Sequence, residues 1–346
     1  MRRVSLFAIA TLGSMFLGQT VLANDMNIVA EPGHPSLQAF RLPDTPPAPA
    51  NNAPTPARVE LGKKLFFDPR LSGNGTISCA TCHNPTLGWS DGLPKGIGIN
   101  GSALPRATPT VINAAYNHIQ MWDGRKRDLE DQAMGPMEAD KEMNADIDAV
   151  IRWLNENDGY RQLFARAYPG EPIDTDTLSR AIASFERTVI SKDSPFDRWS
   201  RGDRRAMTEQ QVRGFRLFIG KAECVKCHSG PNFTDDGFHN VGLASFGDPE
   251  PDAGRYKQVP LRLMKGAFKT PTLRDVTRTA PYFHDGSAAT LEEVVRHYNK
   301  GGEVKTNLDP NIRPLNLTDE EVADLVAFME ALTSPFIEVA LPELPR

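Results

Sequence analysis

SCATCHNP (residues 78–85) and ECVKCHSG (residues 223–230) both contain the pattern Cys-x-x-Cys-His. This pattern is the attachment signature of c-type haem. Its two thiols bond to the vinyl groups of the haem, and the histidine that follows supplies an axial nitrogen to the iron. We therefore predict two covalently bound haem c groups. Their attachment residues are Cys79, Cys82 and His83 at the first motif, and Cys224, Cys227 and His228 at the second.

The two motifs use all four cysteines of the chain. In an exported protein, four cysteines would ordinarily indicate two disulfides. A thioredoxin-like pair does not require a following histidine, and a zinc site would need further ligands that no other cysteine can supply. The duplicated spacing therefore favours haem over disulfides, a redox pair or zinc.

The sequence around the motifs is also repeated. Residues 62–66 (GKKLF) precede the first motif, and residues 214–218 (GFRLF) precede the second. Each half then ends in a stretch with apolar residues at helical spacing, residues 178–190 and 322–332. We predict a mainly α fold in which the order of helix, motif and late helix occurs twice.

This repeat predicts two cytochrome c-like domains, residues 58–195 and 196–346, each with one covalent haem c. Before the last helix, Thr318 and Glu321 have the spacing of a capping box.

The N-terminus has the features of an exported protein. In residues 1–23, two arginines precede an apolar run that ends in Val21-Leu22-Ala23, which predicts a signal peptide cleaved after about Ala23. Residues 24–57 form a Pro-rich N-terminal arm. If the source is a Gram-negative bacterium, export predicts a periplasmic protein.

Charge and hydropathy exclude two classes of partner. The net charge of −5 and the pI of about 5.9 argue against nucleic acid, because phosphate binding needs a basic face. Beyond the N-terminus, no segment is long and apolar enough to span a bilayer. We expect no nucleic-acid partner and no stable membrane insertion.

From about Arg58 to the C-terminal helix, the chain resembles the bacterial di-haem cytochrome c peroxidase/MauG family. Three segments carry this resemblance: LGKKLFFDPRLSGNGTISCATCHNP (61–85), MWDGRKRDLEDQAMGPMEADKEM (121–143) and FKTPTLRDVTRTAPYFHDGSAATLEEVVRHYNKGG (268–302). The resemblance implies an enzyme that reduces H2O2 or uses it to oxidise another molecule. It also implies that the first domain holds the haem that reacts with peroxide and that the second holds an electron-transfer haem.

Peroxide chemistry needs an open iron site and a group that moves a proton between the two oxygens. Spacing alone does not select that group among the acidic residues of segment 128–142. The resemblance implies Glu142 as the acid–base catalyst, with Gln132 beside it. It also implies that Trp122 lies between the haems as a bridge for electrons. The other tryptophans are interpreted as ordinary core or surface residues: Trp89, Trp153 and Trp199.

The first haem lacks an obvious sixth ligand. Many peroxidases of the family carry a histidine in the loop that here reads GIGIN (96–100), but no histidine lies between His83 and His118. We therefore expect the first haem to be five-coordinate in the resting protein and open to peroxide.

The sixth ligand of the second haem decides the character of the enzyme. A methionine raises the haem potential, whereas a tyrosine phenolate or a second histidine lowers it. Where the peroxidase branch has methionine, this chain has Tyr298, as the MauG-like branch does. We predict Tyr298 as the axial ligand. The alternatives are His297, Tyr282, His284 and Met264.

Two positions depart from the family pattern. MauG has a tryptophan two residues before the second motif, which serves as a surface relay, and this chain has Ala222 there. The family also binds calcium between the haems through an asparagine and two backbone carbonyls. Thr279 and Pro281 match the carbonyl positions, but Ala107 replaces the asparagine. If calcium binds, we expect the Thr279 and Pro281 carbonyls to hold it, with water in place of the asparagine side chain.

Together these features predict a periplasmic di-haem peroxidase. Its partners would be H2O2 and either a small electron-donor cytochrome or cupredoxin, or an oxidisable protein substrate. Tyr298 favours the MauG-like branch over simple peroxide scavenging. The competing function is a di-haem electron-transfer cytochrome without peroxide chemistry. It requires two six-coordinate irons, and the Gln132/Glu142 pair counts against it.

Overall fold

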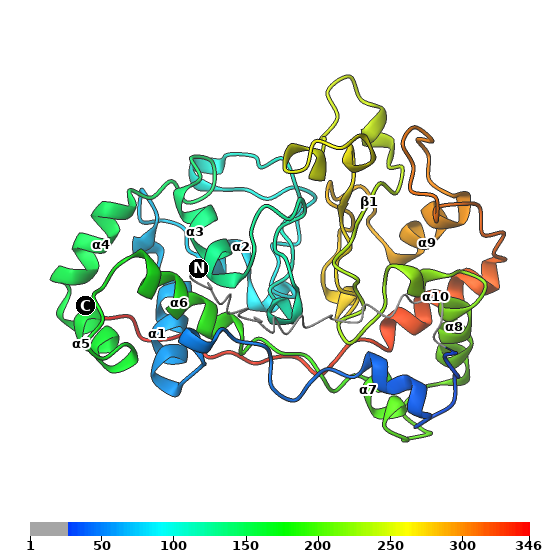
Figure 1. The fold of residues 1–346 in the computed structure, drawn as a ribbon, viewed down its shortest axis with the longest axis horizontal. Helices are drawn as coiled ribbons and strands as arrows, with labels where there is room; N and C mark the ends of the chain where they lie inside the picture. Colours follow the sequence, from blue (N-terminus) through cyan, green and yellow to red (C-terminus); the bar gives the residue numbers. More distant parts are fainter. Residues whose placement is uncertain (1–26) are drawn as a thin grey trace, which may run out of the picture.

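We describe residues 27–346 of a computed structural model of the chain, so the predicted signal peptide lies outside the described residues. Two groups of helices are joined by long loops (Figure 1). The α-helices are α1 (Pro56–Phe67), α2 (Cys79–Cys82), α3 (Leu129–Glu138), α4 (Ile147–Glu156), α5 (Asp158–Ala167), α6 (Thr175–Glu186), α7 (Pro195–Ser200), α8 (Glu209–Ile219), α9 (Leu291–Lys300) and α10 (Asp319–Glu330). The prediction of a mainly α fold is confirmed.

Strands are minor elements. β1 (Phe238–His239) pairs antiparallel with β2 (Phe268–Lys269) in the second half. Among the described helices, none combines the length and apolar character needed to cross a bilayer.

In the first half, α1 packs against α6. The Thr55 and Asp174 side chains cap these helices by accepting backbone N–H groups at 3.3 and 2.9 Å. At the crossing, a Cβ added to Gly62 would lie 1.8 Å from the carbonyl oxygen of Ala181, so only glycine permits this approach. The apolar faces of both helices share one core, which includes Leu61, Leu65, Leu178 and Ile182.

The second half repeats this arrangement with α8 and α10. The predicted capping box of α10 is confirmed, because Thr318 Oγ1 accepts from the Glu321 backbone at 3.2 Å and Glu321 Oε2 accepts from the Thr318 backbone at 2.9 Å. A Cβ on Gly214 would lie 1.9 Å from the Asp324 carbonyl oxygen. The repeated Gly-x-x-Leu-Phe segments are thus the sites where two helices cross most closely.

The N-terminal arm, from the point where the described residues begin, and the C-terminal tail connect the two halves. Leu37 and Phe40, in the short 3-10 helix η2 (Pro35–Phe40), are buried in the core of the second half. The arm then runs to the first half, where buried Asn52 donates to Glu130 Oε1 at 2.7 Å. The C-terminal tail runs the other way, and its Ile337 and Val339 pack against the first core. Figure 1 shows the blue arm and the red tail spanning both helix groups.

An ion-pair network joins the loops of the two halves. The Arg106 guanidinium contacts Asp123 Oδ2 at 2.8 Å and Asp252 Oδ2 at 2.6 Å. Asp123 follows Trp122 in the first half, whereas Asp252 belongs to the second. This network therefore fixes the position of Trp122 relative to the second half.

Candidate active site

The first motif forms α2, and His83 follows directly at its C-terminal end. The ring Nδ1 of His83 lies 3.2 Å from the carbonyl oxygen of Trp89, and because a carbonyl only accepts, Nδ1 is the donor. This tautomer leaves Nε2 free as a metal ligand. The buried Trp89 has a φ of 59°, which turns its carbonyl toward the histidine.

The second motif has the same arrangement. Cys224 to Lys226 form the 3-10 helix η8 (Cys224–Lys226), and His228 Nδ1 donates to the carbonyl oxygen of Phe233 at 3.0 Å. Phe233 is buried and has a φ of 51°. Sequence reasoning missed both carbonyl acceptors. The only available signal was a buried aromatic residue five or six positions after each motif histidine.

A cavity of about 590 Å³ lies next to the second motif. Loops from both halves form its walls, and both motif cysteines open into it. The wall residues that bear on function are Cys224, Cys227, His228, Tyr298, Trp122 and Ala107.

These observations fit haem c. All four motif cysteines are free thiols, although each pair is close enough in sequence to form a redox disulfide. Each histidine is held by a backbone carbonyl with one ring nitrogen left for iron. At the second motif, the adjacent cavity is large and is lined by residues from both halves. Cysteines and histidines of both motifs are thus suited to hold the cofactor that the sequence predicts.

Glu142 lies in a loop that packs against residues 96–100, next to the first motif. The Glu142 carbonyl oxygen accepts from the Ile99 backbone at 2.8 Å, and a Cβ on Gly98 would lie 1.9 Å from the Lys141 carbonyl oxygen. The Ile97 carbonyl oxygen in turn lies 3.8 Å from the Cys82 sulfur. The histidine-free loop 96–100 therefore lies between Cys82 and Glu142. Burial raises the pKa of Glu142, and Arg125 partly opposes this shift.

Gln132 and Trp122 are connected through Met121. Gln132, on α3, places Nε2 4.0 Å from the Met121 sulfur. Trp122, the next residue, donates Nε1–H to the Ala107 carbonyl oxygen at 2.9 Å and lines the cavity at the second motif. Within residues 27–346, no hydrogen bond joins the side chains of Gln132 and Glu142 directly. Met121 and Trp122 both line the cavity at the second motif, and Gln132 contacts the first of them.

An aromatic stack supports Trp122 from the second half. The rings of Phe268 and His284 are stacked with centroids 3.5 Å apart, and His284 meets Trp122 edge-on at 6.4 Å. Burial lowers the pKa of His284 to about 4, so this ring is neutral at physiological pH.

Tyr298 projects from α9 into the cavity wall that also contains His228. Burial raises its pKa, and the two neighbouring motif cysteines add to this effect. Two alternative ligands, Tyr282 and His284, also line the cavity. His297 and Met264 are not wall residues, and His297 Nε2 donates to the Val241 carbonyl oxygen at 2.8 Å. Tyr298 therefore stays the predicted axial ligand of the second haem. Tyr282 and His284 are the alternatives that also line the cavity.

The residues implied in calcium binding also meet at this cavity. Thr279, Pro281 and Ala107 all line it. The Ala107 carbonyl oxygen already accepts from Trp122. Calcium binding stays a prediction.

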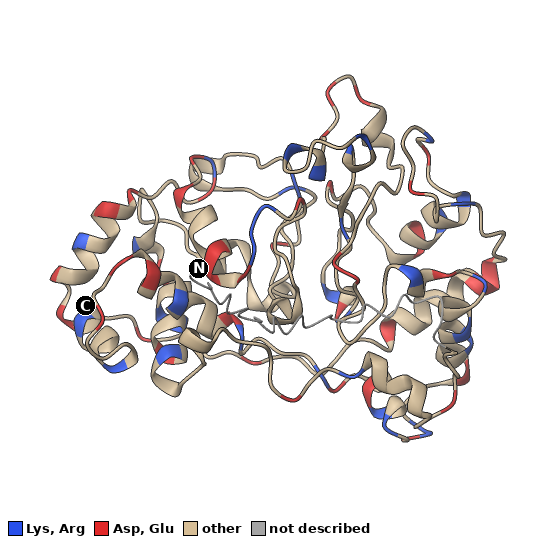
Figure 2. Cartoon of the chain, viewed as in Figure 1, with Lys and Arg blue, Asp and Glu red and all other residues tan. Residues whose placement is uncertain are grey.

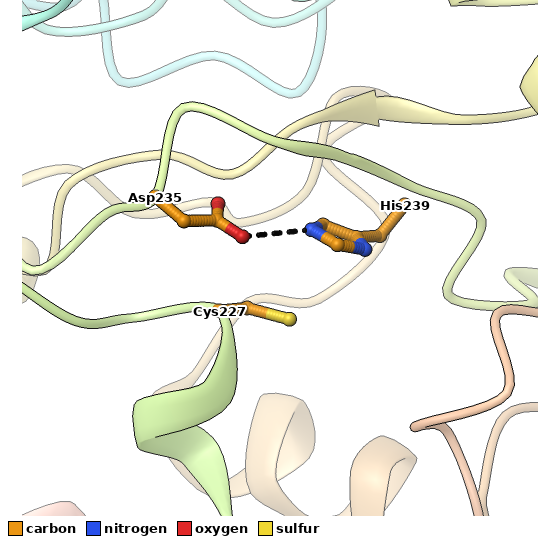
Figure 3. Close-up of side chains that lie close together, drawn as sticks. All are labelled: Cys227, Asp235 and His239. Atoms are coloured by element: carbon orange, nitrogen blue, oxygen red, sulfur yellow. Dashed lines mark hydrogen bonds and ion pairs between the residues drawn. The ribbon is translucent and has the colours of Figure 1, made fainter. Parts of the chain in front are cut away.

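A group of polar residues that the sequence did not indicate lies beside the second motif (Figure 3). Cys227, Asp235 and His239 offer ligand atoms within 4.8 Å of one another. Because the Cys227 sulfur is needed for haem attachment, we interpret the group as an ion-pair network. His239 contacts Asp235 at 3.1 Å and Asp309 at 2.8 Å. Burial disfavours its charged form, but the two carboxylates outweigh this and raise the pKa of His239 to about 12.

Two family models match the two halves of the chain. Residues 56–205 match the family model described as di-haem cytochrome c peroxidase, and residues 211–333 match that described as cytochrome c. Both matches contain one motif each. They confirm the prediction of two cytochrome c-type domains, whereas the boundary at residues 195/196 stays a prediction.

Relatives cover most of the chain. The methylamine utilization protein MauG of Methylorubrum extorquens is 47% identical over 309 residues, which cover 88% of this chain and 86% of the relative. The cytochrome c551 peroxidase of Nitrosomonas europaea is 38% identical over 288 residues, 83% of each chain. Relatives of both branches therefore align with nearly the full length of the chain.

Solved structures share the fold. A MauG-like protein associated with microbial copper homeostasis matches with a TM-score of 0.79 and 33% identity, over 85% of this chain and 95% of that one. The di-haem peroxidase BthA of Burkholderia thailandensis matches with a TM-score of 0.71 and 24% identity, over 88% and 94%. The second match supports the fold alone.

Proposed function

This chain belongs to the di-haem cytochrome c peroxidase/MauG family and is an oxidoreductase of the peroxidase type; from this premise, we propose that it is a periplasmic enzyme of the MauG-like branch. In this proposal it carries two covalent haem c groups and uses H2O2 to oxidise a partner or substrate. The observation that carries the choice of branch is Tyr298, which lines the same cavity as the second motif. The predicted signal peptide supports the location.

When bound, haem c supplies the iron at which peroxide is reduced and the store for oxidising equivalents. Glu142 supplies the proton chemistry. A catalytic acid or base is most effective when its pKa lies near the working pH, and burial shifts the pKa of Glu142 in that direction. The loop at Gly98 and Ile99 contacts the Glu142 backbone on one side and Cys82 on the other, so it holds Glu142 near the first motif.

Trp122 connects the two sites. Its indole is fixed by the hydrogen bond to Ala107, and its neighbour Asp123 is held by Arg106. A rigid indole in the cavity wall shortens the gap that an electron must cross. Trp122 therefore serves as the bridge, and Tyr298 stabilises the oxidised state of the second site.

The test is electron paramagnetic resonance of the resting ferric protein before and after one equivalent of H2O2. We expect one high-spin and one low-spin signal, both of which are lost when peroxide is added. In Glu142→Gln, both signals should persist, and peroxide turnover should fall by about 10²–10⁴-fold, the usual contribution of general acid–base catalysis.

Glu138→Gln is the matched control, because Glu138 is an exposed glutamate at the end of α3. This variant should react as the wild type does. Two low-spin signals that do not respond to peroxide would contradict the proposal and favour an electron-transfer cytochrome. Turnover with simple donors alone, with no oxidation of a protein substrate, would indicate the scavenging branch.

A further inference from the structure

Two carboxylates beside the second motif each hold a turn of their own loop. Asp235 Oδ1 accepts from the Gly237 backbone N–H at 2.8 Å, and Asp309 Oδ1 accepts from the Asn311 backbone N–H, also at 2.8 Å. In both residues the other carboxylate oxygen, Oδ2, faces the ring of His239. Both carboxylates therefore have a structural role in their loops, and together they direct two negative charges at one histidine.

The His239 ring carries a positive charge. Its Nε2 lies 3.1 Å from Asp235 Oδ2, and its Nδ1 lies 2.8 Å from Asp309 Oδ2. Because an ionised carboxylate only accepts hydrogen bonds, both ring nitrogens must donate, and a histidine with two N–H groups is an imidazolium. Burial opposes ionisation of both carboxyls, but hydrogen bonds from His239 outweigh it and hold their pKa values below the ordinary range.

This charge lies next to the atom that attaches the second haem (Figure 3). The ligand atoms of Cys227, Asp235 and His239 all lie within 4.8 Å of one another, and His239 also lines the cavity at the second motif. Once Cys227 is bonded to haem, its sulfur is part of a thioether and carries no charge. The haem-attachment atom therefore lies beside one cation and the carboxylates that hold it.

Other charged side chains around the motif are paired among themselves. Figure 2 shows Asp and Glu interspersed with Lys and Arg over both helix groups, so the charge at the motif depends on the individual groups around it. Lys226 contacts Glu223 at 2.8 Å, and Lys269 contacts Asp236 at 3.2 Å. Among the ion pairs of residues 27–346, His239 is the only cation that contacts Asp235 or Asp309.

We propose that the His239 imidazolium is the counter-charge of the second haem site, and that it holds the reduction potential of this haem above the value that Asp235 and Asp309 alone would impose. Oxidised haem iron carries one more positive charge than reduced iron, so nearby carboxylates stabilise the oxidised form and a nearby cation stabilises the reduced form. His239 touches no reacting atom and acts through its charge. The proposed ligand Tyr298 lowers the same potential, and His239 limits that effect.

This inference goes beyond the proposed function, since it rests on haem c at the second motif and not on peroxide chemistry. The test is a redox titration of the full holo-protein without peroxide, in which the low-spin electron paramagnetic resonance signal follows the second haem. At the wild-type midpoint potential, His239→Gln should lower the ratio of reduced to oxidised second haem by about three- to tenfold. A tenfold change corresponds to about 59 mV for a one-electron couple.

His239→Arg separates charge from packing. Arginine keeps the positive charge and can donate to both carboxylates, whereas glutamine donates without a charge. The ratio in His239→Arg should therefore stay within about twofold of the wild type. An equal fall in the two variants would mean that the shape of the ring matters and its charge does not, which overturns the proposal. A wild-type potential in His239→Gln overturns it as well.

The matched control is His118→Gln. His118 also contacts an aspartate, Asp236 at 3.0 Å, but its side chain is 91% exposed, so solvent screens its charge. This variant should leave the ratio within about twofold of the wild type.

Asp309→Asn decides the question if His239→Gln does not retain both haems. It removes one negative charge while Asp235 keeps His239 protonated, so the ratio of reduced to oxidised second haem should rise. An unchanged or lower ratio overturns the proposal. The predicted shifts in a protein that does not turn over H2O2 support the counter-charge and contradict the peroxidase function instead.

Discussion

Tyr298 is the residue that most separates the two branches of the family. Tyr298→Phe removes the phenolic oxygen and keeps the ring in the cavity wall. If that oxygen binds the second iron, the variant should lose the low-spin signal of this site, and its absorption spectrum should shift. Tyr298→Met should instead keep a low-spin site and raise its potential, because methionine favours reduced iron.

Tyr282→Phe is the control for Tyr298, since Tyr282 lines the same cavity and burial raises its pKa to about 12. This variant should keep the wild-type spectrum. The opposite pattern, a spectral change in Tyr282→Phe and none in Tyr298→Phe, would move the ligand assignment to Tyr282.

Glu186, at the end of α6, predicts a pH dependence of stability. Its Oε2 is buried and has no hydrogen-bond partner among the described residues, and burial raises its pKa to about 8 from an ordinary value of 4.5. Below pH 4.5 the group is protonated in both folded and unfolded chains. Between pH 4.5 and 8 only the unfolded chain ionises, so the folded state loses up to about 1.4 kcal/mol per pH unit.

Glu186→Gln removes this loss. The melting temperature of the variant should equal that of the wild type near pH 4 and exceed it at pH 8. Glu130→Gln should behave in the opposite way, because ion pairing with Arg187 overcomes burial and lowers the pKa of Glu130. A Glu186→Gln advantage that does not change with pH would show that the carboxyl group is ionised in the folded state.

The residues of the two motifs could be predicted because their own side chains attach the haem and bind its iron. Trp89 and Phe233 could not, since their function lies in a backbone carbonyl that a positive φ turns toward the histidine. Any side chain has such a carbonyl, so residue type carries no signal for this role. Glu142 and Tyr298 came from family resemblance, because spacing alone left several carboxylates and several ligands open.

At the scale of elements, the crossing glycines are the tightest constraint. In Gly62→Ala and Gly214→Ala, the new Cβ would lie 1.8 and 1.9 Å from a facing carbonyl oxygen, so the helices must separate. The gain in helix propensity is smaller than the cost of overpacking, and each variant should lose about 1–3 kcal/mol of unfolding free energy. Chemical denaturation measures this loss.

Gly135→Ala is the control for the crossing glycines. Gly135 is also helical, in α3, but a Cβ there would meet only the flexible end of Lys126, at 3.0 Å. This variant should be neutral or slightly stabilised. Equal destabilisation at Gly62 and Gly135 would mean that helix crossing is not the cause.

Helices were easier to predict than loops. The periodic stretches 178–190 and 322–332 became α6 and α10, each shifted by a few residues toward its N-terminal cap. The strands β1 and β2 could not be predicted from the sequence, because a strand of two residues is too short to show a periodic pattern of apolar side chains. The conformation of the long loops that line the cavity at the second motif depends on contacts such as that of Arg106 with Asp252. These contacts join distant parts of the sequence, so local patterns do not predict them.

At the scale of the whole molecule, the arm and the tail tie the two halves together. Sequence reasoning interpreted residues 24–57 as an arm with no assigned role and placed the C-terminus in the second domain. The contacts of Leu37 with the second core and of Ile337 with the first core run against chain order. Such contacts are invisible to local patterns, because each segment is only a few residues long and is apolar on one side.

This arrangement predicts coupled unfolding of the two halves. Ile337 and Val339 are half-buried against the first core, while Glu338 between them is exposed. Ile337→Ser/Val339→Ser would remove apolar contacts worth roughly 1–3 kcal/mol from the first half and leave the second core unchanged. Calorimetry should therefore show one transition in the wild type and an earlier, separate transition of the first half in the variant.

Leu341→Ser, at a side chain that is 80% exposed, should keep the single transition. If the double variant melts as one unit at the wild-type temperature, the tail does not couple the halves, and the arm with the Arg106 network must account for their association.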